Sequence, residues 1–188
     1  EKKAILEKYT KEYSAEYQAQ ALIDIAKKLN KKIQNLSQIK KIDIYTSHHT
    51  HYVIGTGAND PQKMDPNASR ETLDHSIMYI FAVALEDASW HHVNSYKKSR
   101  ANKKSTIKIW RSIKTHEDKK WTKKYHDPNP KNKSFGAKVV VTLNNNKKII
   151  EQLDKADAHP YGLRPFVRKN YINKFLTLTK NILSKKES

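Results

Sequence analysis

The sequence predicts an α+β fold in which a small antiparallel sheet, containing a β-hairpin, packs against helices. Three observations support this prediction. Apolar residues recur at helical spacing in the segments 14–32, 69–85 and 166–183. Alternating or β-branched runs occupy 39–46, and two further runs flank an asparagine turn at 144–146. With 188 residues and 37% hydrophobic content, the chain is long enough for one domain with one core.

The first helix is expected over residues 14–32, with Ser14 as a plausible N-cap. Its apolar stripe consists of Tyr17, Ala21, Ile25 and Leu29. The segment 39–46 follows, in which Ile42 and Ile44 point to one side and the polar residues to the other. This alternation is typical of a half-buried strand.

The strongest helical pattern begins at Ser69, which can cap the helix, and continues to residue 85. The recurring apolar residues are Leu73, Ile77, Ile80, Phe81 and Ala84. Because the apolar surface is wide, we expect this helix to be the central buried one. A further helix is predicted over 105–112, whereas 113–125 fits a helix and a strand equally well.

The segments 135–143 and 147–153 are predicted to form the hairpin, because three asparagines between them tolerate left-handed backbone. Residues 156–165 are expected to be irregular, since they contain two prolines and a glycine. The last helix is predicted to begin at Pro165 or Phe166 and to end at Leu183.

The net charge of +18 comes almost entirely from lysine, since only five residues are arginine. A solvated lysine-rich surface is the simplest interpretation, and steering of a substrate with several carboxylates is the second. Nucleic-acid binding is the third, because phosphate recognition usually relies on arginine.

The chain contains no cysteine, which excludes disulfides, iron–sulfur clusters and thiolate zinc sites. No apolar run approaches the ~20 residues of a membrane span, and no signal peptide opens the sequence. The sequence starts at Glu1 rather than at methionine, so we expect a fragment or a processed product.

Three histidines, His48, His49 and His51, lie in a glycine-containing loop after the predicted strand. On a strand, His49 and His51 would share one face and could chelate a metal with His75 or Asp60 as a third ligand. Hydrogen bonding or loop packing is the commoner role, and contact with an anionic ligand is a further one. The nearby sequence Gly55-Thr56-Gly57 lacks the lysine and the spacing of a P-loop.

Other polar residues are adjacent in sequence and could form proton-transfer pairs. They are His91 with His92, His116 with Glu117 and Asp118, and His126 with Asp127. Adjacent polar residues on loops usually face water, which is the competing interpretation. The segment 8–17 places lysines and a glutamate around tyrosines just before a helix, an arrangement that favours a carboxylate pocket.

Several motifs in fixed order resemble the MmgE/PrpD family, and within it they are most similar to 2-methylcitrate dehydratase. They are YSAEYQAQ (13–20), the run 47–79 ending in DHSIMY, WHH (90–92), YHDP (125–128), FGAKVVVT (135–142) and AHPYGLRPF (158–166). The resemblance implies two parts in this chain: an α+β lid domain over 1–158, and a C-terminal helix over 159–188. That helix would return to a large helical domain that is missing from the sequence.

The resemblance also implies an activity. 2-Methylcitrate dehydratase is a hydro-lyase that converts 2-methylcitrate into 2-methyl-cis-aconitate during propionate breakdown, without an iron–sulfur cluster or another cofactor. Other family activities, decarboxylation or epimerisation of related acids, are the alternative, and a basic nucleic-acid-binding module is a more distant one. We expect a cytoplasmic enzyme with a tricarboxylate substrate, commonly a homodimer, with neither nucleic acid nor membrane as a partner.

Site residues follow from the resemblance as well. Lys11 matches a family lysine two residues before an aromatic position, here Tyr13, that faces the substrate. Glu16 falls where some members carry a histidine, and His75 and Tyr79 belong to the helix motif of the lid. The main catalytic histidine, aspartate and lysine would lie in the helical domain, so we expect the isolated chain to be inactive and to hold no metal.

Overall fold

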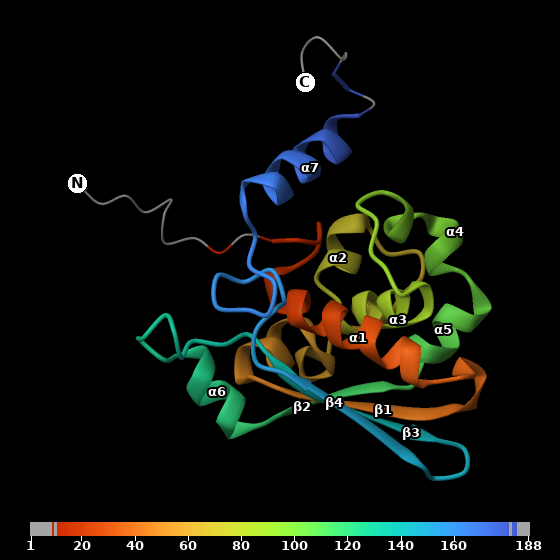
Figure 1. Ribbon diagram of the computed structural model, residues 1–188. Helices are drawn as coiled ribbons and strands as arrows, with labels where there is room; N and C mark the ends of the chain where they lie inside the picture. The colour runs from red at the N-terminus through yellow and green to blue at the C-terminus, as the bar shows by residue number, and fades with distance from the viewer. Residues whose placement is uncertain (1–8, 10, 181, 184–188) are drawn as a thin grey trace.

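The computed structural model describes residues 9, 11–180 and 182–183. Within this part, four strands form one sheet, and helices cover one of its faces (Figure 1). The strands are β1 (Ile39–Thr46), β2 (Ile113–Glu117), β3 (Ala137–Leu143) and β4 (Lys148–Leu153), in the spatial order β2-β1-β3-β4. The predicted α+β class and the β3–β4 hairpin are therefore confirmed. The hairpin turn contains Asn146 at φ 63°, a left-handed conformation that asparagine tolerates.

The sheet is mixed, whereas the sequence pattern predicted an antiparallel one. Ile44 of β1 lies opposite Val139 of antiparallel β3 and opposite Thr115 of parallel β2. Parallel neighbours need a crossover connection, and residues 47–112 provide one that carries four α-helices. The ambiguous segment 113–125 resolves into β2 followed by α6 (Lys119–Tyr125), and the Asp118 side chain accepts a hydrogen bond from the Lys120 amide (2.9 Å) at the start of α6.

Helix α1 (Gln20–Lys32) packs on β3 and β4 on one side and on α3 (Ile77–Asp87) on the other. Three of the four predicted stripe residues, Ala21, Ile25 and Leu29, are at most 2% exposed, whereas Tyr17 precedes the helix and is only partly buried. Each fully buried leucine or isoleucine contributes about 2 kcal/mol, so this contact is a main source of stability. The helix starts at Gln20 rather than near Ser14, because residues 17–19 form a 3-10 turn instead.

The single helix predicted from Ser69 is two helices, α2 (Arg70–Asp74) and α3. The Ser69 hydroxyl accepts a hydrogen bond from the Thr72 amide (3.2 Å), and the Ser76 hydroxyl accepts one from the Tyr79 amide (3.2 Å). Since each serine caps its own helix, the chain turns between them at His75. The prediction of a central buried helix is confirmed for α3, whose residues 77–85 are all buried.

Helices α4 (Lys98–Ala101) and α5 (Lys104–Arg111) complete the layer that covers the sheet, and α3 contacts α5. Helix α7 (Arg168–Thr179) is shorter than predicted and lies away from the sheet (Figure 1). Its apolar residues Tyr171, Phe175 and Leu178 are 36–49% exposed. Among the described residues, no helix combines the length and the apolar character that crossing a membrane would require.

Candidate functional site

A surface hollow of about 310 Å³ lies between the segment that precedes α1 and helix α2. It brings together Lys11 and His75, two of the predicted site residues, from distant parts of the sequence. Its other polar or charged lining residues are Ser14, Arg70, Glu71, Asp74 and Tyr96. The hollow therefore contains cations, carboxylates and an imidazole side by side, which is the set of groups that acid–base chemistry on a carboxylate substrate needs.

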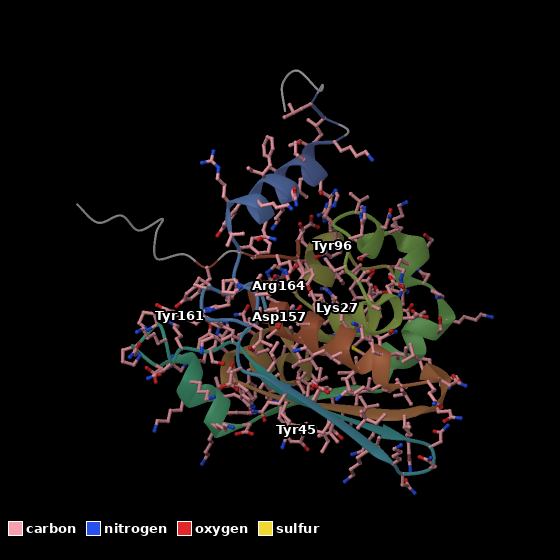
Figure 2. All side chains as sticks on the ribbon, in the orientation of Figure 1. Lys27, Tyr45, Tyr96, Asp157, Tyr161 and Arg164 are labelled. Atoms are coloured by element: carbon pink, nitrogen blue, oxygen red, sulfur yellow. The ribbon has the colours of Figure 1, made fainter. Side chains whose placement is uncertain are left out.

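Tyr96 connects the two walls of the hollow and lies beside α2 (Figure 2). Its hydroxyl lies 2.9 Å from the Ser14 carbonyl oxygen and also contacts the Asp74 carboxylate. The Trp90 indole donates a second hydrogen bond to the same carbonyl (3.1 Å). Burial and the neighbouring Asp74 raise the pKa of Tyr96 far above its ordinary value, so the hydroxyl keeps its proton.

Glu16, Asp74 and His75 form a cluster at the hollow. The Glu16 amide donates to Asp74 Oδ1 (3.1 Å), and Glu16 Oε2 lies 3.8 Å from His75 Nε2. His75 Nδ1 lies 2.9 Å from the Glu71 carbonyl oxygen, which places a proton on Nδ1 and leaves Nε2 facing Glu16. At 3.8 Å the imidazole and the carboxylate are neighbours, but the distance is longer than a direct hydrogen bond.

The same three residues, within the described part of the chain, form a group whose ligand atoms all lie within 4.8 Å of one another. Their oxygen and nitrogen atoms match the ligands of several divalent metals. Exposed acidic groups adopt such spacings commonly without a metal, and Asp74 is already engaged by Tyr96 and by the Glu16 amide.

Two predicted site residues, Tyr13 and Tyr79, lie in the protein interior. The Tyr13 hydroxyl donates to Asp24 Oδ1 (2.6 Å) and accepts from Lys27 Nζ (3.0 Å). Tyr79 is fully buried and donates to the Ser95 carbonyl oxygen, and its burial raises its pKa to about 12. Both hydroxyls are thus engaged by protein groups.

Lys11 is exposed and is one of the residues that line the hollow. Its carbonyl oxygen accepts a hydrogen bond from Lys174 of α7, so α7 helps to hold this segment in place. The neighbouring Glu12 is paired with Arg164 (2.8 Å) and takes no part in the hollow. Lys8, which belongs to the same predicted pocket, lies outside the described residues.

Arg70 is a lining residue that the sequence patterns did not reveal. One guanidinium nitrogen donates to the His92 carbonyl oxygen (3.1 Å), and the guanidinium carbon lies 4.8 Å from the centre of the Tyr96 ring. Sequence spacing could not indicate that Arg70 lies near Lys11, because the two residues come together only in the folded chain. The one available signal was the rarity of arginine in a lysine-rich sequence.

The histidine loop has a packing role. Residues 50–54 form a π-helix, so His49 and His51 do not share a strand face. His48 contacts Glu117 (3.1 Å), His51 contacts Thr115 (2.7 Å), and the His49 ring stacks on Tyr125 (5.3 Å). Because the three rings have separate partners, the alternative of a metal site with His75 or Asp60 is not realised among the described residues.

The close packing of this loop accounts for the glycine at position 57, because a Cβ there would come within 2.5 Å of the His51 ring. In two of the candidate proton-transfer groups a residue contacts another partner, whereas His91 and His92 contact each other. His116 Nε2 contacts Asp43 across the sheet (3.0 Å) rather than its sequence neighbours. Asp127 accepts from the Asn129 amide (2.9 Å), and the rings of His91 and His92 stack on each other (4.5 Å).

Comparison with known families identifies the fold family of this chain. Residues 13–188 match the family model described as the MmgE/PrpD C-terminal domain. The matched range includes Glu16, Arg70 and the segment 74–79, and it contains every helix and strand named above. Lys11 lies two residues before it.

Proposed function

Because this chain belongs to the MmgE/PrpD family, whose members are generally hydro-lyases or related enzymes, we propose that it is the C-terminal part of a 2-methylcitrate dehydratase-like enzyme. The enzyme would remove water from 2-methylcitrate to give 2-methyl-cis-aconitate in propionate catabolism. The observation that supports this proposal most directly is the hollow in which Lys11, Arg70 and His75 meet.

The chemistry requires three kinds of group. A base removes a proton from the carbon next to a carboxylate, an acid protonates the departing hydroxyl so that water leaves, and cations hold the carboxylates. Lys11 and Arg70 are the cations in this proposal. His75, which lies 3.8 Å from Glu16, is placed to transfer a proton.

The remaining catalytic groups would come from a helical domain of the same enzyme, outside this sequence, that covers the hollow. In this proposal the intact enzyme is a cytoplasmic homodimer. The net charge of +18 would steer a tricarboxylate towards it at low ionic strength.

The test is an assay of the full-length natural protein with 2-methylcitrate, following formation of the unsaturated acid. Release of carbon dioxide, or a change of configuration without loss of water, would replace the dehydratase by a decarboxylase or an epimerase of the same family. The isolated 188-residue chain is the second sample. We expect no turnover from it, and robust turnover would show that the catalytic residues lie within this chain.

Substitution Lys11→Ala in the full-length protein should raise KM for 2-methylcitrate at least about tenfold. A hydrogen bond to a charged group contributes about 1.5–3 kcal/mol, which corresponds to this range. Steady-state kinetics measure the effect, with Lys31→Ala on the exposed side of α1 as the matched control. An unchanged KM in Lys11→Ala would remove Lys11 from the site.

A further inference from the structure

Arg70 is an oriented cation without a carboxylate partner among the described residues. The contact with the His92 carbonyl oxygen (3.1 Å) and the Tyr96 ring (4.8 Å) hold its guanidinium group in place. Two other arginines are neutralised: Arg100 pairs with Glu86 and Asp87, and Arg164 pairs with Glu12. A guanidinium carries five N–H donors, so the contact with His92 leaves most of them available.

The acids that line the hollow are engaged by protein donors instead. Asp74 contacts the Tyr96 hydroxyl and accepts the Glu16 amide. For Glu71, a hydrogen bond to its own amide and one to the Ser69 hydroxyl lower the pKa of the carboxyl group. The carboxylates of Asp74 and Glu71 are therefore already engaged, whereas the cations Lys11 and Arg70 are more available to a ligand.

Tyr96 holds the Arg70 guanidinium group in its orientation. Its ring lies under Arg70, and its hydroxyl is fixed between the Ser14 carbonyl oxygen and Asp74. A guanidinium stacked on an aromatic ring loses little further freedom when it binds a planar carboxylate, so binding costs less ordering. The side chain is thus preorganised for an anion with two oxygens.

We propose that Arg70 binds one carboxylate of the substrate through its guanidinium fork while Lys11 binds another. This pair, one residue on each wall of the hollow, would make the site selective for acids that carry an additional carboxylate. The inference rests on the proposed function, and it names the residue that determines its substrate class. Lysine offers a point charge and arginine a two-pronged donor, so the two residues are not equivalent.

The experiment compares two non-reacting acids, tricarballylate with three carboxylates and butyrate with one. Isothermal titration calorimetry measures their binding to the full-length natural protein and to its Arg70→Ala and Arg70→Lys variants. We expect Arg70→Ala to weaken tricarballylate binding at least about tenfold, since one charged hydrogen-bonded contact is lost, and butyrate binding less than threefold, since its single carboxylate can still bind Lys11. Arg70→Lys should fall between Arg70→Ala and the natural protein.

Arg111→Ala, at an exposed arginine of α5, is the matched control and should bind both acids normally. Equal losses for the two acids, or no loss in Arg70→Ala, would overturn the assignment. Thermal unfolding of each variant shows whether the fold is intact, and a folded Arg70→Lys decides the question if Arg70→Ala unfolds.

The result also separates this inference from the proposed function. If the natural protein converts 2-methylcitrate and Lys11→Ala impairs it while Arg70→Ala binds normally, only the role of Arg70 is wrong. If tricarballylate binding depends on Arg70 but 2-methylcitrate is not converted, the carboxylate site stands and the dehydratase proposal fails.

Discussion

At the scale of single residues, His159 shows how the fold controls a protonation state. The side chain is 3% exposed, and its ring lies 4.5 Å from that of Tyr9. Nδ1 accepts a hydrogen bond from the Tyr161 amide (3.0 Å), so the neutral ring carries its proton on Nε2, which has no partner among the described residues. Burial, and secondarily the charge of Lys155, lower the pKa of His159 to about 4.

This shift predicts a loss of stability in acid. Between the unfolded value of 6.5 and the folded value of about 4, the unfolded chain binds more protons than the folded one. The contribution of His159 is therefore complete above pH 6.5 and decreases as the pH falls, by up to about 3 kcal/mol. Urea unfolding from pH 4 to 7.5 should show a shallower dependence in His159→Gln than in the natural chain.

Other groups also titrate in this range, and Asp24, whose pKa burial raises, acts in the opposite direction. Both the variant and the natural chain contain these groups, so the difference between the two pH dependences removes their contribution. His126→Gln, at an exposed histidine, is the control and should keep the natural slope. Parallel slopes for His159→Gln and the natural chain would contradict the prediction.

At the scale of elements, the break between α2 and α3 decides which residues face the hollow. If the helix from Ser69 were continuous, Asp74 and His75 would lie on the same helix axis as the residues of α3. The separate caps at Ser69 and Ser76 turn the chain at His75 instead, so that the α2 end meets the segment of Glu16. The site therefore depends on two serine side chains that touch no ligand.

Ser76 should matter more than Ser69. The Ser76 hydroxyl is fully buried, accepts from the Tyr79 amide (3.2 Å) and donates to the Lys63 carbonyl oxygen (2.7 Å). We expect Ser76→Ala to cost about 2 kcal/mol of unfolding free energy, through the lost cap and an unpaired, partly buried carbonyl. Ser69→Ala, at an exposed cap, should cost about 1 kcal/mol or less. Chemical denaturation of both variants tests the order, and a larger loss in Ser69→Ala would refute it.

At the scale of the whole molecule, a buried polar network joins segments from both ends of the described chain. Asp24 of α1 accepts from the Tyr13 hydroxyl (2.6 Å) and from the Asp157 amide (2.8 Å). Figure 2 shows Lys27, Asp157 and Arg164 near α1, and Lys27 Nζ donates to the Tyr13 hydroxyl (3.0 Å). The segment that carries Lys11 is consequently anchored to the core and to the chain before α7.

Tyr13→Phe should test this anchor. Removal of the hydroxyl leaves the buried Asp24 carboxylate with one donor fewer, so we expect a loss of about 1–3 kcal/mol in unfolding free energy. Tyr45→Phe is the control, because Tyr45 stacks on His116 on the sheet face that the helices leave open (Figure 2). Equal stability of Tyr13→Phe and the natural chain would show that the network contributes nothing.

Features that depend on residues close together in the sequence could be predicted from it, and features that depend on distant residues could not. Repeating apolar spacing predicted the buried stripe of α1, the burial of α3 and the β3–β4 hairpin, because these patterns express local geometry. The boundaries at Gln20 and His75 were missed, since serine caps and 3-10 turns compete with the helical pattern over a few residues. The parallel β1–β2 pair was missed because its partners are separated by a long crossover.

For the site, ordered motifs named Lys11, Tyr13, Glu16, His75 and Tyr79 as candidates, and the family they indicated is confirmed by the match over 13–188. The fold class and the family were thus determined by the sequence alone, through local periodicity and motif order. Only the tertiary structure decided that Lys11 and His75 share a hollow with Arg70, while Tyr13 and Tyr79 are enclosed. The physical reason is that a shared hollow depends on contacts between residues far apart in the chain, which no local pattern encodes.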